Sequence, residues 1–255
     1  MILHSNVIGN GEPFIILHGF LGMGDNLKTL AQKISESNFE VHILDARNHG
    51  RSFHDQEFSY EVMAQDVLNY VNEKSLNPAI VLGHSMGGKT AMTFATENPD
   101  KVEKLIVADI APRYYPVHHD AILQGLFELE NQKLNNRSEA DEILAQFVPD
   151  FGTRQFLLKN LYWTKEKTLS LRLNLGVLTE QVSEVGEPLS PSAVYNKPTL
   201  FIKGDRSEYV SENDKADIKR HFPKAVIESV SKAGHWLHVE NAEEFLDKVM
   251  AFVLK

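Results

Sequence analysis

The stretch VLGHSMGGKT, residues 81–90, places Ser85 between Gly83 and Gly87, directly after an apolar run and directly before a segment with helical spacing. The pattern G-x-S-x-G in a strand–turn–helix context is the signature of a nucleophile elbow, in which a sharp turn lifts a serine hydroxyl above the edge of a sheet. The two glycines leave room for that turn because they carry no Cβ atom. The sequence therefore predicts that Ser85 is a catalytic nucleophile.

Short apolar runs alternate with amphipathic segments along the chain. The runs are FIILH, VHILD, IVLG, LIVAD and TLFIKG, at residues 14–18, 41–45, 80–83, 105–109 and 199–204. Continuous apolar runs of this length are typical of strands buried on both faces of a parallel sheet. The amphipathic segments between them predict covering helices. The 255 residues are therefore expected to form an α/β fold with a mostly parallel central sheet flanked by helices.

Residues 113–196 interrupt this alternation, because helix-like segments follow one another there without a strand-like run. We predict that this segment is a helical lid and that residues 1–112 and 197–255 form the core domain. Loops at the carboxyl edge of a parallel sheet carry the sites of such folds, so the lid is expected to gate or shape a pocket. Whether its apolar residues line that pocket or pack in the core stays open for Phe127, Phe156, Leu157 and Trp163.

The composition limits the classes of function. A formal net charge of −9 and an isoelectric point near 5.7 argue against nucleic acid or an anionic membrane as the main partner, and leave a small molecule. The absence of cysteine excludes a disulfide framework, a cysteine zinc site and a cysteine nucleophile. No secretion signal begins the chain, and no stretch reaches the ~18 apolar residues of a membrane span. We expect a soluble, cytoplasmic protein, and the sequence leaves its oligomeric state open.

A tetrahedral intermediate at Ser85 requires two backbone donors. One comes from the residue after the nucleophile and the other from the loop after an early strand. Met86 occupies the first position, and HGFLG follows FIIL directly, so Phe20 is predicted to present the second N–H group. The sequence thus predicts an oxyanion hole formed by the amides of Phe20 and Met86.

The general base is predicted to be His235. It lies in KAGHWLHVENAEEF, on a loop near the C-terminus that follows the expected strand AVIESV. His238 falls toward the next helix and is expected to be structural. His118 and His119 are adjacent in the lid, so their side chains project differently, and no acidic cluster lies nearby. We predict that these two histidines lie on the lid surface and that the protein has no metal site.

Several motifs together resemble a known family. HGFLG, DARNHGRS, GHSMGG and AGHW, spread over residues 18–236, are similar to the α/β-hydrolase superfamily, and ADIAP, RQFLLKNL and GxxSxYV look like the bacterial YbfF-type esterases. The resemblance implies an α/β-hydrolase fold with the lid between the sixth and seventh core strands. It also implies a cofactor-free carboxylic ester hydrolase that acts on small acyl esters and accepts thioesters. The wider superfamily has a glycine where this chain has Asn48, and asparagine tolerates left-handed backbone.

The acid that orients His235 is less obvious. In most α/β-hydrolases it ends a G-x-x-D sequence after the strand read here as TLFIKG, but this chain has Ser207 at that position. Asp205 lies two residues early and Glu208 one residue late. The preceding strand end offers Asp109 in LIVADIAP, at the same edge of the sheet, and the resemblance to the YbfF-type esterases points to this aspartate as well. We predict Asp109 as the acid, with Asp205 as the alternative.

Two other classes of function stay open at this point. Lyases and C–C bond hydrolases of the same fold act on carboxylate-bearing substrates and need pocket arginines, for which Arg113, Arg154 and Arg172 are candidates. A binding protein that keeps the fold without turnover is the second class, and an intact Ser85 and His235 argue against it. The favoured reaction is attack of Ser85 on an acyl carbonyl, with His235 as base and no cofactor.

Overall fold

The computed structural model describes residues 1–76 and 78–255. Among these residues, a central sheet has seven strands in the order β1-β3-β2-β4-β5-β8-β9. Strand β1 pairs with β3 in the antiparallel direction, and all other neighbours are parallel. This arrangement confirms the predicted mostly parallel sheet. The strands are β1 (Ser5–Gly9), β2 (Glu12–Leu17), β3 (Phe39–Leu44), β4 (Ala79–His84), β5 (Val102–Ala108), β8 (Thr199–Gly204) and β9 (Ala225–Val230).

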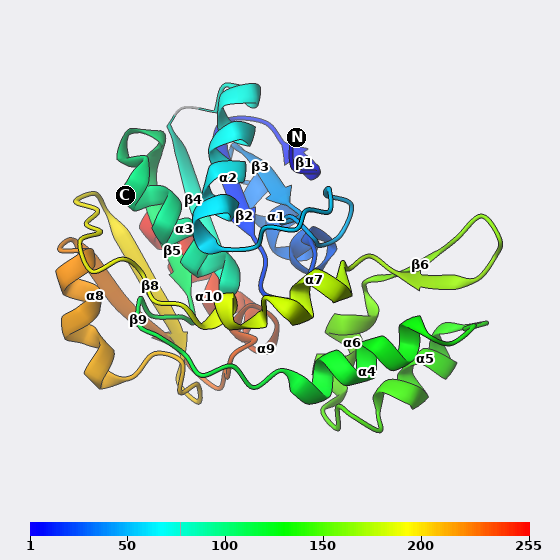
Figure 1. Cartoon of the computed structure of the whole chain (residues 1–255). Helices are drawn as coiled ribbons and strands as arrows, with labels where there is room; N and C mark the ends of the chain where they lie inside the picture. The colour runs from blue at the N-terminus through cyan, green and yellow to red at the C-terminus, as the bar shows by residue number, and fades with distance from the viewer. Residues whose placement is uncertain (77) are drawn as a thin grey trace.

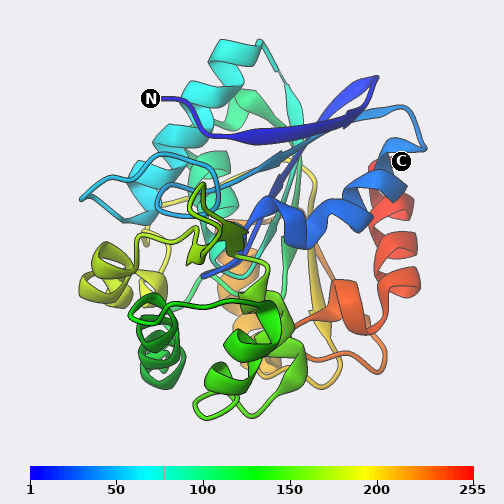
Figure 2. The same cartoon turned by 90° about the vertical axis from the view of Figure 1, so that its right-hand side faces the viewer.

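Helices cover both faces of this sheet, as strand β2 illustrates. Its side chains alternate, so that Phe14 and Ile16 pack against α1 and α10, whereas Ile15 and Leu17 pack against α2 and α3. Figure 2 shows α1 and α10 on one side of the sheet and α2 and α3 on the other. Both faces of the strand are therefore buried over residues 14–17, which explains the apolar run FIIL. The covering helices are α1 (Lys28–Ser35), α2 (Tyr60–Lys74), α3 (Met86–Glu97), α8 (Lys215–His221) and α10 (Ala242–Val253).

The strand order determines where a site can form. Strand β3 lies on one side of β2 and β4 lies on the other, so the chain reverses its direction across the sheet between β2 and β4. In open α/β sheets, ligands bind outside the carboxyl ends of the strands at such a switch point. The loop HGFLG follows β2, and Ser85 follows β4. The predicted oxyanion loop and the predicted nucleophile therefore lie at the same crevice.

The segment between β5 and β8 forms a separate group of elements. Figure 1 shows α4, α5 and α6 gathered beyond the edge of the sheet, with α7 between this group and the core. The elements are α4 (Asp120–Glu130), α5 (Arg137–Leu144), α6 (Phe151–Leu158), β6 (Leu161–Trp163), β7 (Leu169–Leu171) and α7 (Leu175–Glu180), followed by a short 3₁₀ helix, Val182–Gly186. A third hydrophobic cluster joins leucines of these helices to Phe20, Met63 and Met86 of the core.

Two expectations about this segment are wrong. Strands β6 and β7 form an antiparallel hairpin in which Leu161 pairs with Leu171, where only helices were expected. Each strand has three residues, too few for an alternating pattern to stand out from the flanking helical sequence. The insertion also follows the fifth strand of the described sheet, not the sixth, because β1 to β5 precede it and β8 is the next strand of that sheet.

Within the described residues, no helix combines the length and the apolar character of a membrane span.

Candidate active site

Ser85 lies in a strained turn between β4 and α3. Its backbone has φ 54° and ψ −119°, a left-handed conformation that non-glycine residues rarely adopt. A Cβ atom on Gly83 would lie 2.1 Å from the carbonyl oxygen of Gly87, and one on Gly87 would lie 2.4 Å from that of Leu17. Only glycine fits at both positions. The turn therefore has the geometry of a nucleophile elbow, and Ser85 lines a cavity.

Asp109 and His235 meet at the same edge of the sheet. The Nδ1 atom of His235 lies 2.8 Å from Oδ2 of Asp109, and the carboxylate is fully buried. Asp109 is the first residue after β5, has φ 54°, and donates its own N–H to the carbonyl of Ile202 on β8 at 2.8 Å. The 2.8 Å between His235 and Asp109 is typical of a charge-assisted hydrogen bond. The structure thus brings the predicted acid and the predicted base together.

Two donors from the end of β8 complete the surroundings of this carboxylate. The N–H group of Gly204 donates to Oδ1 of Asp109 at 3.1 Å, and the hydroxyl of Ser207 donates to Oδ2 at 2.5 Å. Ser207 therefore contacts the same oxygen as His235. Sequence reasoning found Ser207 only as the residue that replaces the usual acid, and missed that a hydroxyl there reaches the carboxylate of the neighbouring strand.

Asp205, the alternative acid, contacts the backbone of the loop that leads to His235. Its Oδ1 atom accepts the N–H group of Ala233 at 3.1 Å, and its side chain is exposed to solvent. Hydrogen bonds from the backbone of Lys232 and Ala233 lower the pKa of this carboxyl group. The contact holds the loop that leads to His235 and does not involve the imidazole. Glu208, the other nearby carboxyl group, lines the cavity.

Tyr209 and His84, the residue before Ser85, hold His235 in place. Tyr209 stacks on it, with ring centroids 4.0 Å apart and an interplanar angle of 20°. The Nε2 atom of His84 lies 2.8 Å from the carbonyl oxygen of His235. Burial, followed by the neighbouring His238 and His235, lowers the pKa of His84, so its ring is neutral and Nε2–H can donate to that carbonyl. This bond ties the loop that carries His235 directly to the elbow.

The amides predicted to form an oxyanion hole lie beside the same cavity. Phe20 and Met86 both line it, together with Ser85. In the part of the chain that the structure describes, neither of these two N–H groups donates to a protein acceptor. Buried backbone donors are nearly always paired, so two unpaired amides that flank one serine are unusual. The arrangement suits a developing negative charge.

The cavity has a volume of about 260 Å³ and is mostly apolar. None of the four lid residues left open above lines it. Leu157 is buried in the third hydrophobic cluster, which joins the inserted helices to Phe20, Met63 and Met86. Phe127 and Phe156 pack against that cluster, and Trp163 is 54% exposed. The lining residues are Phe20, Tyr60, Ser85, Met86, Ile110, Arg113, Tyr115, Pro116, Val117, His118, His119, Val185, Gly186, Glu208 and Tyr209.

One of the two adjacent histidines before α4 lies elsewhere than predicted. His118 is exposed, but both it and His119 line the cavity, and the ring edge of His119 faces Phe20 with centroids 5.0 Å apart. The expected position on the lid surface is therefore wrong for His119, because the segment before α4 turns inward over the elbow. Among the described residues, no group of three or more histidine, aspartate or glutamate side chains could hold a metal ion.

Comparison with known proteins extends this picture. The sequence pattern of the α/β hydrolase fold matches residues 12–242. The chain belongs to the α/β-hydrolase family. It is 37% identical to the sn-1-specific diacylglycerol lipase ABHD11 of Mus musculus, over 94% of this chain and 80% of that protein. It is 33% identical to esterase YbfF of Escherichia coli, over 96% and 94%. A solved marine microorganism esterase is 36% identical, with a TM-score of 0.94 and coverage of 98% and 99%.

In this α/β-hydrolase, sequence reasoning also missed Lys89, on the first turn of α3. Its side chain is buried, and its ammonium donates to the carbonyls of Arg113 at 2.8 Å, Gly186 at 3.1 Å and Glu187. Burial lowers the pKa of this group to about 7. One side chain behind the elbow thus binds the chain where it enters the inserted segment and where it leaves. Its position in GHSMGGK was visible in the sequence, but its partners are not local.

Proposed function

We propose that this α/β-hydrolase is a serine esterase that hydrolyses small acyl esters through an acyl-enzyme on Ser85. The observation that carries the proposal is the contact of 2.8 Å between His235 and the buried Asp109, on a loop that is bonded to His84, the residue before Ser85. The names of the relatives, an esterase and a lipase, confirm the class of enzyme, a carboxylic ester hydrolase. The triad and the substrate are our inference.

The proposed reaction begins when His235 takes the proton of Ser85 as its oxygen attacks the acyl carbonyl. The carbonyl oxygen becomes an oxyanion, which the N–H groups of Phe20 and Met86 stabilise. His235 then donates its proton to the leaving alcohol as the C–O bond breaks, and the acyl group stays on the serine. A water molecule, activated by the same imidazole, releases the acid. Asp109 holds the imidazole in the tautomer that leaves Nε2 free to accept a proton.

The cavity supports small acyl groups as substrates. Its volume of about 260 Å³ lies below the ~300–1,000 Å³ of pockets that enclose drug-sized ligands. Its apolar lining suits a hydrocarbon chain next to the scissile carbonyl. The same chemistry cleaves a thioester, because a thiolate is a better leaving group than an alkoxide. We therefore include acyl thioesters in the proposal.

The alternative, a lyase or C–C bond hydrolase, requires a cation that is free to bind a substrate carboxylate. Of the three candidate arginines in the described chain, Arg113 is the one that lines the cavity, and its Nε atom is paired with Asp214 at 2.8 Å. Arg154 is paired with Asp141 at 2.8 Å. Arg172 lies over the ring of Tyr162, 4.2 Å from its centroid. These contacts favour the ester substrate.

A substrate panel tests the proposal. We expect p-nitrophenyl acetate and butyrate to be hydrolysed with a higher kcat/KM than the palmitate ester, and short acyl-CoA thioesters to be cleaved as well. Ser85→Ala should lower kcat by about 10⁴-fold or more, since loss of a triad member leaves only the contribution of the oxyanion hole and binding. A circular dichroism spectrum like that of the wild type would show that the fold is intact. Full activity of Ser85→Ala would refute the proposal.

A further inference from the structure

The loop that carries Phe20 is a tight turn in a strained conformation. The N–H group of Gly22 donates to the carbonyl of Gly19 at 3.0 Å, which closes the turn. Leu21, its third residue, has φ 59°. Turns with a positive φ at this position strongly favour glycine, and a leucine there is retained only when its surroundings hold it. The peptide between Phe20 and Leu21 therefore needs a contact from outside the loop.

His49 provides that contact from the loop after β3. Its Nε2 atom accepts the N–H group of Leu21 at 3.2 Å, and its Nδ1 atom lies 2.8 Å from the carbonyl oxygen of Arg47. A carbonyl oxygen can only accept, so the proton of the neutral ring must be on Nδ1. The Nε2 lone pair is then directed at the Leu21 amide. The ring is fully buried, and burial lowers its pKa to about 3, so it stays neutral.

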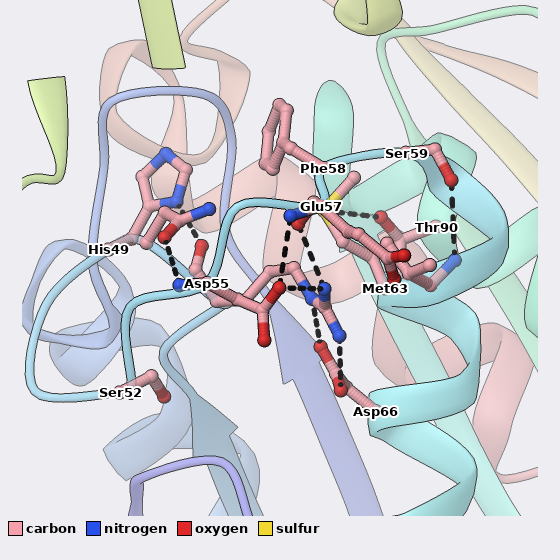
Figure 3. Close-up of polar contacts among 12 residues, drawn as sticks. His49, Ser52, Asp55, Glu57, Phe58, Ser59, Met63, Asp66 and Thr90 are labelled. Atoms are coloured by element: carbon pink, nitrogen blue, oxygen red, sulfur yellow. Dashed lines mark hydrogen bonds and ion pairs between the residues drawn. The ribbon is translucent and has the colours of Figure 1, made fainter. Parts of the chain in front are cut away.

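The position of this imidazole is itself fixed. Its ring packs against both Phe20 and Phe58, with centroids 6.0 and 6.1 Å away. The guanidinium of Arg47 anchors the same loop through two bonds to Asp66, at 2.6 and 2.9 Å. Figure 3 shows Asp66 with these contacts, and His49 and Phe58 on the same loop. The imidazole is thus a rigid support and not a mobile surface group.

We propose that His49 is a positioning residue of the oxyanion hole. It fixes the Phe20–Leu21 peptide so that the adjacent Phe20 N–H group points at the position of the developing oxyanion. The inference rests on the proposed function, because a hole is required only if Ser85 forms a tetrahedral intermediate. From the lid side, Nδ2 of Asn160 donates to the carbonyl of Leu21 at 2.7 Å, so the same residue is held from both sides.

The test replaces the acceptor and follows the transition state separately from the ground state. In His49→Phe, a ring of similar shape lacks the acceptor. We expect kcat for p-nitrophenyl butyrate to fall about tenfold or more, and KM to change less than about threefold, since a misplaced donor acts mainly on the transition state. The inhibition constant of a trifluoromethyl ketone, which forms an oxyanion on the serine, should rise in parallel with the loss of kcat/KM. His49→Gln, which can place an amide oxygen near Leu21, should recover part of the loss.

His42→Phe is the matched control. His42 is buried to a similar degree, and its ring nitrogens contact Tyr70 and Glu40 at 2.8 Å, away from the oxyanion loop. It should lower the melting temperature but leave kcat within about twofold. Should His49→Phe not fold, His49→Leu gives the variant without an acceptor. A folded acceptor-free variant with wild-type kcat, or a loss of kcat without weaker ketone binding, overturns the proposal. If wild-type protein hydrolyses no ester and Ser85 does not react with a fluorophosphonate, the proposed function fails instead, and this inference fails with it.

Discussion

The carboxyl ends of β5 and β8 lie side by side but contribute different groups, one that contacts the imidazole of His235 and one that contacts its carboxylate partner. Strand β5 ends in Asp109, whose carboxylate contacts His235 at 2.8 Å. Strand β8 is followed by Ser207, whose hydroxyl contacts that carboxylate at 2.5 Å. The two strands pair in parallel, with Ala108 opposite Ile202, so β5 ends beside β8 at the same edge of the sheet, and β8 continues to Gly204. A carboxylate at either position, 109 or 207, is therefore placed close to the same histidine.

The difference between the two ends also appears in the backbone. Asp109 has φ 54°, a strained conformation that directs its side chain toward the base loop. Asp205, after β8, instead accepts the N–H group of Ala233 and stabilises the loop that carries His235. One aspartate is thus placed to act on the imidazole, and the other to support its backbone. This contrast can be tested by substituting each group in turn.

The largest effect is expected for the acid. Asp109→Asn should lower kcat by up to ~10⁴-fold, because an amide at this position favours the wrong imidazole tautomer. Asp205→Asn should lower kcat by less than about tenfold, since its contact is with backbone amides. Steady-state kinetics of both variants with p-nitrophenyl butyrate gives the comparison. A severe loss in Asp205→Asn with a mild loss in Asp109→Asn would assign the acid to the later strand.

A smaller effect is expected for the hydroxyl on β8. Ser207→Ala removes a hydrogen bond to a charged group, worth about 1.5–3 kcal/mol, of which only part is felt in the transition state. We expect kcat to fall about tenfold with little change in KM. Ser231→Ala is the matched control, because its hydroxyl also donates to a carboxylate at 2.5 Å, that of Glu244, at a distance from the base. Equal losses in the two variants would mean that Ser207 has no specific role.

The smallest effect concerns stability. His235 has Asp109 as its carboxylate partner, and we contrast it with His238, three residues later. His238 has no carboxylate partner among the described residues, and burial lowers its pKa from 6.5 to about 4. Between these values the unfolded chain binds a proton that the folded chain does not. The free energy of unfolding should therefore fall as the pH falls from 6.5 toward 4, by up to about 1.4 kcal/mol per pH unit from this group.

Urea unfolding of wild type and His238→Phe at pH 7.5 and pH 5 measures this contribution. The variant should lose less stability between the two pH values than the wild type does. An equal loss in both proteins would show that His238 does not remain neutral in the folded state.

Much of the fold could be predicted because its signals are local. Strands buried on both faces have continuous apolar sequences, as in β2 and β4, and the elbow at Ser85 requires glycines at fixed spacing. The hairpin β6–β7 could not be predicted, since its strands of three residues are defined by pairing with each other. The contacts of His49, Lys89 and Ser207 were missed for a related reason. Their partners lie on other elements, and no spacing in one sequence reports such distances.

Identification of the acylated residue tests the central claim most directly. Wild-type protein is mixed with p-nitrophenyl butyrate, quenched with acid within the first turnovers, digested and analysed by mass spectrometry. We predict one butyryl group, on the peptide that contains Ser85, and a larger acylated fraction if the later hydrolysis step is slowed. An acyl group on a different serine, or rapid turnover with no acylated peptide at any quench time, would contradict the account.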